Sequence, residues 1–131
     1  MAVKLMVNLD YYCMKYGQQI SKLDKIEKNV LRNALGILKE DGVYAMFLWL
    51  EDKDKRIRKE GLGKLLSDRA IKELFIQNNS NNIKVNGDDF RQFSLNLQNI
   101  ASDINQLFLL KKLLERTLVY ALYHVKVGAG E

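Results

Sequence analysis

The chain has 131 residues, of which 47% are hydrophobic and 28% are charged. This apolar content excludes a disordered chain, and the length suits one hydrophobic core, so we expect a single domain over 1–131. Twenty-one basic residues against sixteen acidic ones give a net charge of +5, which suits a phosphate-bearing partner without requiring one.

Apolar residues recur at helical spacing, and the chain contains no proline that would interrupt a helix. We therefore predict an all-α fold, a single compact bundle of about five to six helices that ends in a long C-terminal helix. The first helix is expected to present one apolar face, formed by Leu5, Leu9, Tyr12, Cys13 and Tyr16. Gly17 is expected either to end that helix or to weaken it.

The second predicted helix carries an apolar stripe from Leu23 to Leu38. Its opposite, polar side presents Lys22, Lys25, Lys28 and Arg32. Glu40-Asp41-Gly42 predicts a turn, because glycine readily adopts the conformation that ends a helix. The following segment, VYAMFLWL at 43–50, is too apolar to face water on any side and predicts a short buried helix.

Residues 51–63 predict a charged linker, because the run EDKDKRIRKE holds five basic and four acidic residues and Gly61 and Gly63 bracket a break. Its denser half, KRIRK, is a secondary candidate for nucleic-acid contact. Helical spacing resumes over 65–75. The Asn-rich segment 77–89 then predicts an exposed loop, and Asp88 or Asp89 is a plausible N-cap for a helix that begins near Phe90.

The last predicted helix has an apolar seam from Ile104 to Val125 that includes Phe108 and covers most of its circumference. Only a narrow polar strip remains, formed by Asn105, Lys112, Glu115 and Arg116. Twenty-four residues make a helix of about 36 Å. Such a helix is expected at the centre of a bundle, against another subunit, or both.

Few residues suit catalysis. Cys13 is the single cysteine, which excludes an intramolecular disulfide and favours a small buried hydrophobe. His124 is the single histidine, and we expect it to serve packing or a surface hydrogen bond. The acidic doublets at 40–41, 51–52 and 88–89 fit helix capping or solvation better than a Mg²⁺ site. We therefore expect a protein that is not an enzyme, with no catalytic residue, metal or cofactor.

No apolar run approaches the length of about 20 residues needed to cross a bilayer, and the N-terminal segment carries Lys4 and Asp10, unlike a signal peptide. We expect a cytoplasmic protein without a membrane partner. A helix-turn-helix reader of DNA is disfavoured, because the helix after Gly42 offers only the Tyr44 hydroxyl and the Trp49 indole as polar groups.

Two basic surfaces are candidates for RNA binding. The first comprises Lys22, Lys25, Lys28 and Arg32. In the second, Lys112 and Arg116 are four residues apart and so share a helix face. A phosphate between them would offset their repulsion. Both surfaces also fit ordinary solvated helix faces.

Three stretches of the chain follow the pattern of one known family. They are 35–53, LGILKEDGVYAMFLWLEDK; 65–75, LLSDRAIKELF; and 109–126, LLKKLLERTLVYALYHVK. They resemble the small α-helical subunit of type III-B (Cmr) CRISPR–Cas effector complexes. In that family a basic residue and then Arg-Thr lie on a long terminal helix, and Lys112, Arg116 and Thr117 fit this register. The Asn-rich loop and the tail VGAGE depart from the family pattern.

The resemblance implies a non-catalytic protein whose copies stack head to tail into a minor filament. This filament would help to hold the duplex of crRNA and target RNA, beside the other Cmr effector subunits. Two alternatives stay open: a helical DNA-binding or regulatory protein, and a pure oligomerisation module. An enzyme that uses scattered carboxylates is a further, weaker alternative.

Overall fold

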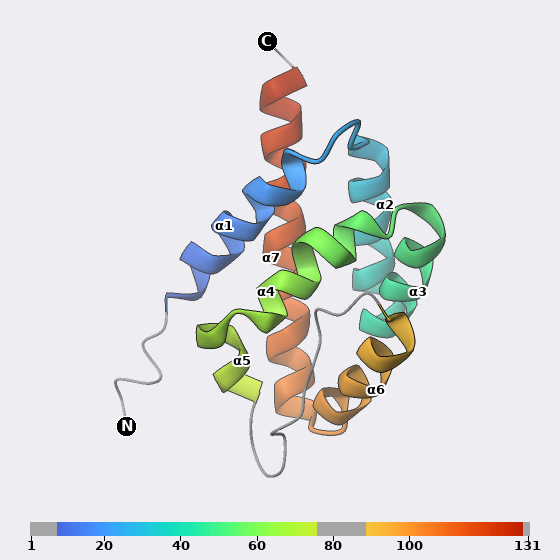
Figure 1. The fold of residues 1–131 in the computed structure, drawn as a ribbon, viewed down its shortest axis with the longest axis vertical. Helices are drawn as coiled ribbons and strands as arrows, with labels where there is room; N and C mark the ends of the chain where they lie inside the picture. The colour runs from blue at the N-terminus through green and yellow to red at the C-terminus, as the bar shows by residue number, and fades with distance from the viewer. Residues whose placement is uncertain (1–7, 76–88, 130–131) are drawn as a thin grey trace.

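The computed structural model describes residues 8–75 and 89–129, and in this part of the chain all regular secondary structure is helical (Figure 1). The elements are α1 Leu9–Ser21, α2 Lys28–Asp41, α3 Val43–Lys53, a π-helical segment η2 Arg58–Leu62, α4 Gly63–Ser67, α5 Arg69–Phe75, α6 Phe90–Ala101 and α7 Ile104–Ala129. The predicted all-α class and the long C-terminal helix are confirmed. The described residues hold seven α-helices, more than the five to six predicted. The predicted Asn-rich loop lies outside the described residues, apart from Asp89.

Helix α7 runs through the middle of the bundle, with α1 crossing it on one side and α2 and α3 on another (Figure 1). Its buried residues include Leu110, Leu114, Leu118 and Ala121, all completely inaccessible to solvent. At 26 residues it is about 39 Å long. The C-terminal turns of α7 extend beyond the other helices, whereas its first turns lie beside α6.

The crossing of α1 over α7 depends on Gly17, which does not end α1. A Cβ atom at Gly17 would lie 2.8 Å from the Cβ of Tyr120 and 3.0 Å from the carbonyl oxygen of Thr117. Glycine therefore allows the two helix backbones to approach more closely than any other residue would. On another side of α1, Gly61 lies against Ile20, where a Cβ would be 2.3 Å from Cγ1. Two glycines thus allow α1 to pack tightly against both α7 and η2.

The charged linker predicted over 51–63 is wrong: most of this segment is helical and part of it is buried. The Arg58 side chain is completely buried, and its Nε and Nη2 lie 2.5 and 3.3 Å from the carboxylate oxygens of Glu51. The guanidinium also lies over the rings of Phe90 and Phe93, at 5.5 and 5.2 Å from their centroids. The predicted break at Gly61 and Gly63 is likewise absent, because η2 continues directly into α4.

The chain does break at Asp68, within the helix predicted over 65–75. Asp68 has extended backbone angles, and its carboxylate accepts a hydrogen bond from the backbone N–H of Ala70 at 3.1 Å. The hydroxyl of Tyr16 donates to the same carboxylate at 2.6 Å. Burial, together with this hydrogen bond, raises the pKa of Tyr16 well above its usual range. This contact ties the turn between α4 and α5 to α1.

Several local signals in the sequence are confirmed. Asp89 caps α6, its carboxylate accepting from the N–H of Arg91 at 2.9 Å. Gly42 separates α2 from α3. Its φ of +105° is a backbone conformation that residues with a side chain rarely adopt. Cys13 is completely buried. The predicted start of the second helix is wrong, because α2 begins at Lys28 and the residues from Leu23 to Ile26 belong to a turn that packs on the core.

The expectation that the segment 43–50 faces water on no side is also wrong. Helix α3 does face solvent, since Tyr44 and Leu48 are 50% and 47% exposed. On α7, Ile104 and Phe108 belong to the predicted apolar seam, yet they are 64% and 59% exposed. Only the part of the seam that faces α1, α2 and α6 is covered.

The two glycines at 17 and 36 provide a matched test of the α1–α7 contact. Gly17→Ala should lower the free energy of unfolding by about 1–3 kcal/mol, because the new methyl group overlaps α7. Gly36→Ala should raise it by up to about 1 kcal/mol, because nothing lies within 4 Å and alanine favours helix. Urea unfolding followed by circular dichroism measures both changes. An equal effect of the two substitutions would contradict the close approach of α1 to α7.

Candidate nucleic-acid and assembly surfaces

The first predicted basic surface spans the turn between α1 and α2. Lys22 is the C-cap residue of α1, Lys25 lies in the turn with φ +56°, and Lys28 is the first residue of α2. The expectation that all of these side chains project from the second helix is therefore wrong for Lys22 and Lys25. Together with Arg32, one turn further along α2, these residues are exposed and form a basic run.

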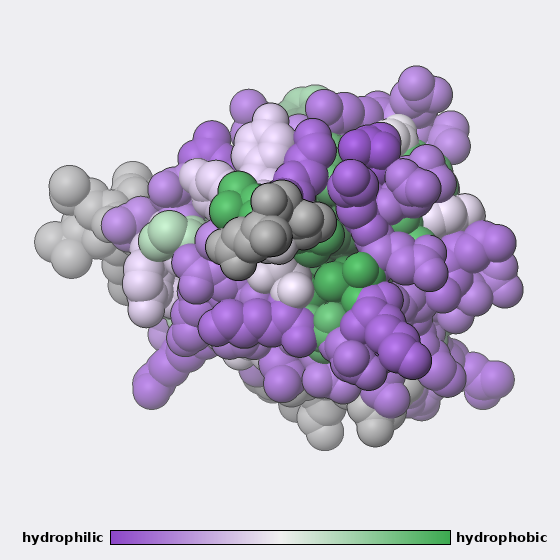
Figure 2. Space-filling model, turned by 90° about the horizontal axis from the view of Figure 1, so that it is seen from above, coloured by the Kyte–Doolittle hydropathy of each residue, from purple (hydrophilic) through white to green (hydrophobic). Residues whose placement is uncertain are grey.

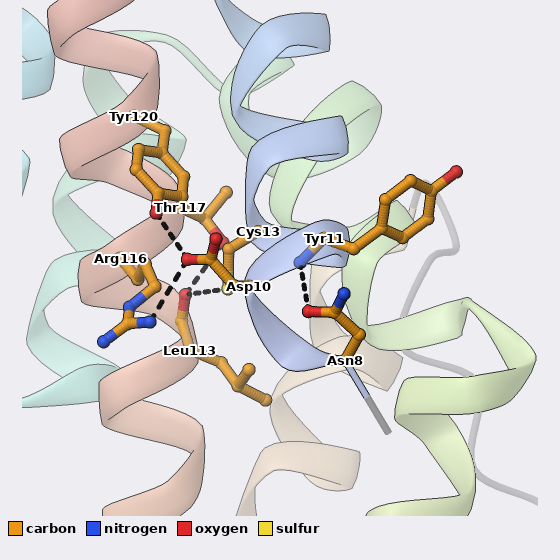
Figure 3. Close-up of polar contacts among 8 residues, drawn as sticks. All are labelled: Asn8, Asp10, Tyr11, Cys13, Leu113, Arg116, Thr117 and Tyr120. Carbon is orange, nitrogen blue, oxygen red and sulfur yellow. Dashed lines mark hydrogen bonds and ion pairs between the residues drawn. The ribbon is translucent and has the colours of Figure 1, made fainter. Parts of the chain in front are cut away.

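The second predicted basic surface is weakened by a neighbour that the sequence did not reveal. Lys112 and Arg116 are both exposed on α7. The guanidinium of Arg116 lies 3.2 Å from the carboxylate of Asp10, which also accepts a hydrogen bond from the hydroxyl of Tyr120 (Figure 3). This hydrogen bond raises the pKa of Tyr120. Asp10 thus offsets the charge of Arg116, so Lys112 contributes more of this surface's net positive charge.

The local structure of α1 positions Asp10 for this contact. The side chain of Asn8 caps the helix by accepting from the N–H of Tyr11 at 3.1 Å, and Asp10 follows in the first turn (Figure 3). One turn later, the thiol of Cys13 lies 3.6 Å from the carbonyl oxygen of Leu113. Burial raises the pKa of this thiol, which therefore stays protonated and serves packing.

The secondary candidate KRIRK, at 55–59, does not form an open cationic patch. Arg56 forms an ion pair with Asp54 at 2.8 Å and donates to the carbonyl oxygen of Asp24 at 2.6 Å. The hydrogen bond from Arg56 lowers the pKa of the Asp54 carboxyl. Arg58 is buried beside Glu51. Two of the four cations in this run are therefore engaged within the fold.

The described residues of the acidic doublets have different surroundings. Glu51 pairs with Arg58 and Asp89 caps α6, whereas Glu40 and Asp41 are exposed at the end of α2. Within residues 8–75 and 89–129, no three histidine, cysteine or acidic residues lie together as a metal-binding group.

An apolar pocket lies where α3, α6 and the first turns of α7 meet. It has a volume of about 270 Å³ and is lined mostly by apolar atoms. Its lining residues are Asp41, Val43, Tyr44, Leu97, Gln98, Ala101, Leu107 and Leu110. The exposed side chains of Ile104 and Phe108 lie on the same turns of α7. We call this region the pocket end. Sequence periodicity could not predict it, because it depends on how three helices meet.

The other end of α7 is also partly apolar. Tyr123 and Val127 are 56% and 68% exposed in its last turns. The ammonium group of Lys126 lies 5.7 Å from the centroid of the Tyr123 ring. Figure 2 views the molecule from above, the direction in which α7 projects, and shows hydrophobic residues gathered near the middle of a largely hydrophilic face. We call the last turns of α7 the free end. His124 is exposed here as well.

Comparisons with protein-family models, curated proteins and solved structures find no match to this chain. Within the described residues, no helix combines the length and the apolar content needed to cross a membrane. Function is therefore inferred from the sequence resemblance and from the basic run, the pocket end and the free end.

Removing the charge of Asp10 should release Arg116. Asp10→Asn should change the free energy of unfolding by less than about 1 kcal/mol, because exposed ion pairs contribute little. The variant should elute from phosphocellulose at higher salt than wild type. Asp41→Asn is the matched control. It changes the net charge by the same amount, but Asp41 forms no ion pair in the described structure, so no cation is released. Equal shifts for both variants would show that Arg116 is not restrained by Asp10.

Proposed function

We propose that this protein is the non-catalytic small subunit of a type III-B CRISPR RNA-guided effector complex. Its copies stack head to tail into a minor filament and help to hold the guide–target RNA duplex, beside the other Cmr effector subunits. Two observations support this proposal: the sequence resemblance, and a chain that exposes apolar surfaces at both ends of its central helix.

The observation that carries the proposal is the placement of the pocket end and the free end. Leu107 and Val127 are separated by 20 helical residues, or about 30 Å along the axis of α7. The free end of one molecule therefore cannot fill its own pocket. It can fill the pocket of a second copy, which leaves an unused pocket and an unused free end for further copies. Head-to-tail contacts of this kind propagate unless the rotation between copies closes a ring.

The charges at the two ends are complementary. Asp41 lines the pocket end, whereas Lys126 lies between the exposed apolar residues of the free end. Docking of the free end into the pocket would bring a cation toward an anion and cover apolar surface on both copies. The ion pair would favour this orientation over a contact between two like ends.

Contact with RNA is supported by the exposed basic run of Lys22, Lys25, Lys28 and Arg32. A few phosphate contacts on a single domain give weak, salt-sensitive binding. Stacked copies place the same run repeatedly along one RNA, which raises the overall affinity through effective concentration without a new kind of contact.

Head-to-tail stacking predicts that two different defects complement each other. Val127→Glu places an anion at the free end, where it would face Asp41 in the stacked arrangement. Ala101→Gln fills part of the pocket with a longer, uncharged side chain at the exposed end of α6. Each variant alone should weaken self-association at least tenfold, as measured by sedimentation equilibrium. An equimolar mixture should form a dimer and no larger species, because only one intact pocket and one intact free end can meet.

Met14→Glu is the matched control, since Met14 is an exposed apolar residue on α1, away from both ends. This variant should associate as the wild type does. A wild-type protein that stays monomeric at all accessible concentrations, or a mixture of the two defective variants that stays monomeric, would contradict the stacking arrangement.

The RNA contact predicts a strong dependence on the basic run. Replacing Lys22, Lys25 and Lys28 together with glutamine should weaken binding to duplex RNA about tenfold or more, because phosphate contacts are lost. Wild-type binding should itself be lost by about 0.3 M salt. Filter binding measures both effects. Unchanged RNA affinity in a correctly folded variant would favour the pure oligomerisation module, and a preference for duplex DNA of a given sequence would favour the DNA-binding alternative.

A further inference from the structure

A second hollow, which shares only Asp41 with the lining of the pocket end, lies between α2 and α3. It has a volume of about 360 Å³ and is lined by polar as well as apolar atoms. Arg32, Asn33 and Gly36 line it from α2, and Trp49 lines it from α3. We call this hollow the α2–α3 groove. Its volume falls within the range of sites that bind small molecules or single nucleotides.

Gly36 keeps the groove open. Nothing lies within 4 Å of the position that a Cβ atom would occupy at this residue. A glycine in the interior of a helix costs about 1 kcal/mol relative to alanine. The packing of α2 does not require this glycine, in contrast to Gly17. Its effect is to leave space beside Trp49, the single tryptophan of the chain, which is packed partly on the core and partly accessible.

We propose that the α2–α3 groove binds one nucleotide of single-stranded RNA, with the base stacked on Trp49 and the phosphate held by Arg32. The inference rests on the proposed function, because it requires an RNA partner. Aromatic side chains bind single-stranded nucleic acids by stacking on their bases, and a neighbouring cation holds the backbone.

The charges around the groove favour one orientation of the bound nucleotide. Arg32 is exposed and donates to no carboxylate in the described structure. Its Nη1 donates instead to the side-chain oxygen of Asn29, which is neutral, at 3.1 Å. Its charge is therefore available to a phosphate, and Lys28, another member of the basic run, lies one helical turn away. Glu40 and Asp41 line the opposite part of the groove and repel phosphate.

The same carboxylates favour particular bases. A glutamate or aspartate can accept a hydrogen bond from the exocyclic amino group of cytosine. With its phosphate at Arg32, a cytidine stacked on Trp49 can direct this amino group toward Glu40. Uracil has no such donor. The groove is therefore expected to prefer oligocytidylate to oligouridylate.

The single tryptophan provides a direct test. Wild-type protein is titrated at low salt with oligocytidylate of about 12 nucleotides, a length within the range of known single-strand sites. Stacking should quench the fluorescence of Trp49 in a saturable manner, and inorganic phosphate alone should not. Arg32→Gln should weaken the binding about tenfold, and oligouridylate should bind more weakly than oligocytidylate.

Gly36→Gln should abolish the quenching because its side chain fills the groove. Its thermal unfolding should be unimpaired, since a helix-favouring residue enters open space. Met14→Gln is the control, because Met14 is an exposed residue of α1 that lies outside the groove and away from both ends of α7. Arg91→Gln, which removes an exposed arginine from α6, controls for the loss of one charge.

A parallel measurement separates the two proposals. The anisotropy of fluorescently labelled oligocytidylate reports binding anywhere on the protein. Binding seen by anisotropy without quenching of Trp49, or quenching that survives Gly36→Gln, overturns the groove proposal and leaves the proposed RNA contact intact. If neither signal responds, while duplex RNA still binds, the groove proposal alone fails; if duplex RNA does not bind either, the RNA contact of the proposed function fails with it.

Discussion

The contact between α1 and α7 is the constraint on which the rest of this bundle depends. Because Gly17 has no side chain, the backbone of α1 lies directly against the turn of α7 that holds Thr117 and Tyr120. This approach brings Cys13 to the carbonyl oxygen of Leu113 and Asp10 to Arg116. The other side of α1 then receives η2 at Gly61. One helix thus links the central helix to the segment that carries the buried Arg58.

Local rules were sufficient for much of the fold. Helical spacing predicts α2 and α7, and the apolar run at 43–50 predicts α3. A carboxylate before Phe90 predicts the start of α6, and Gly42 predicts the turn after α2. Each of these signals acts within one or two helical turns. The predicted start of α2 is wrong because the apolar residues of the preceding turn also pack on the core. Their spacing matches that of the helical stripe, although this turn is not helical.

The errors over 51–63 have a different cause. A run of charged residues resembles a solvated linker unless a partner is known, and the partners of Arg58 are Glu51, seven residues before it, and the rings of Phe90 and Phe93, more than 30 residues after it. A buried arginine requires such partners, because the cost of removing its charge from water must be offset. The break predicted at Gly61 is wrong for a similar reason. Its close neighbour, Ile20, lies on another helix.

The candidate surfaces show the same division between local and long-range information. Sequence alone could name the cations of the two basic surfaces, because most lysine and arginine side chains are exposed in folded proteins. It could not show that Asp10 offsets Arg116 across 106 residues, or that Arg32 is bonded only to an amide in the described structure. It also could not separate the covered part of α7 from the exposed part, because a helix that is apolar around most of its circumference has no single face. The side chains left uncovered in its first and last turns, which include Phe108 and Val127, are the surfaces on which the proposed stacking of copies depends.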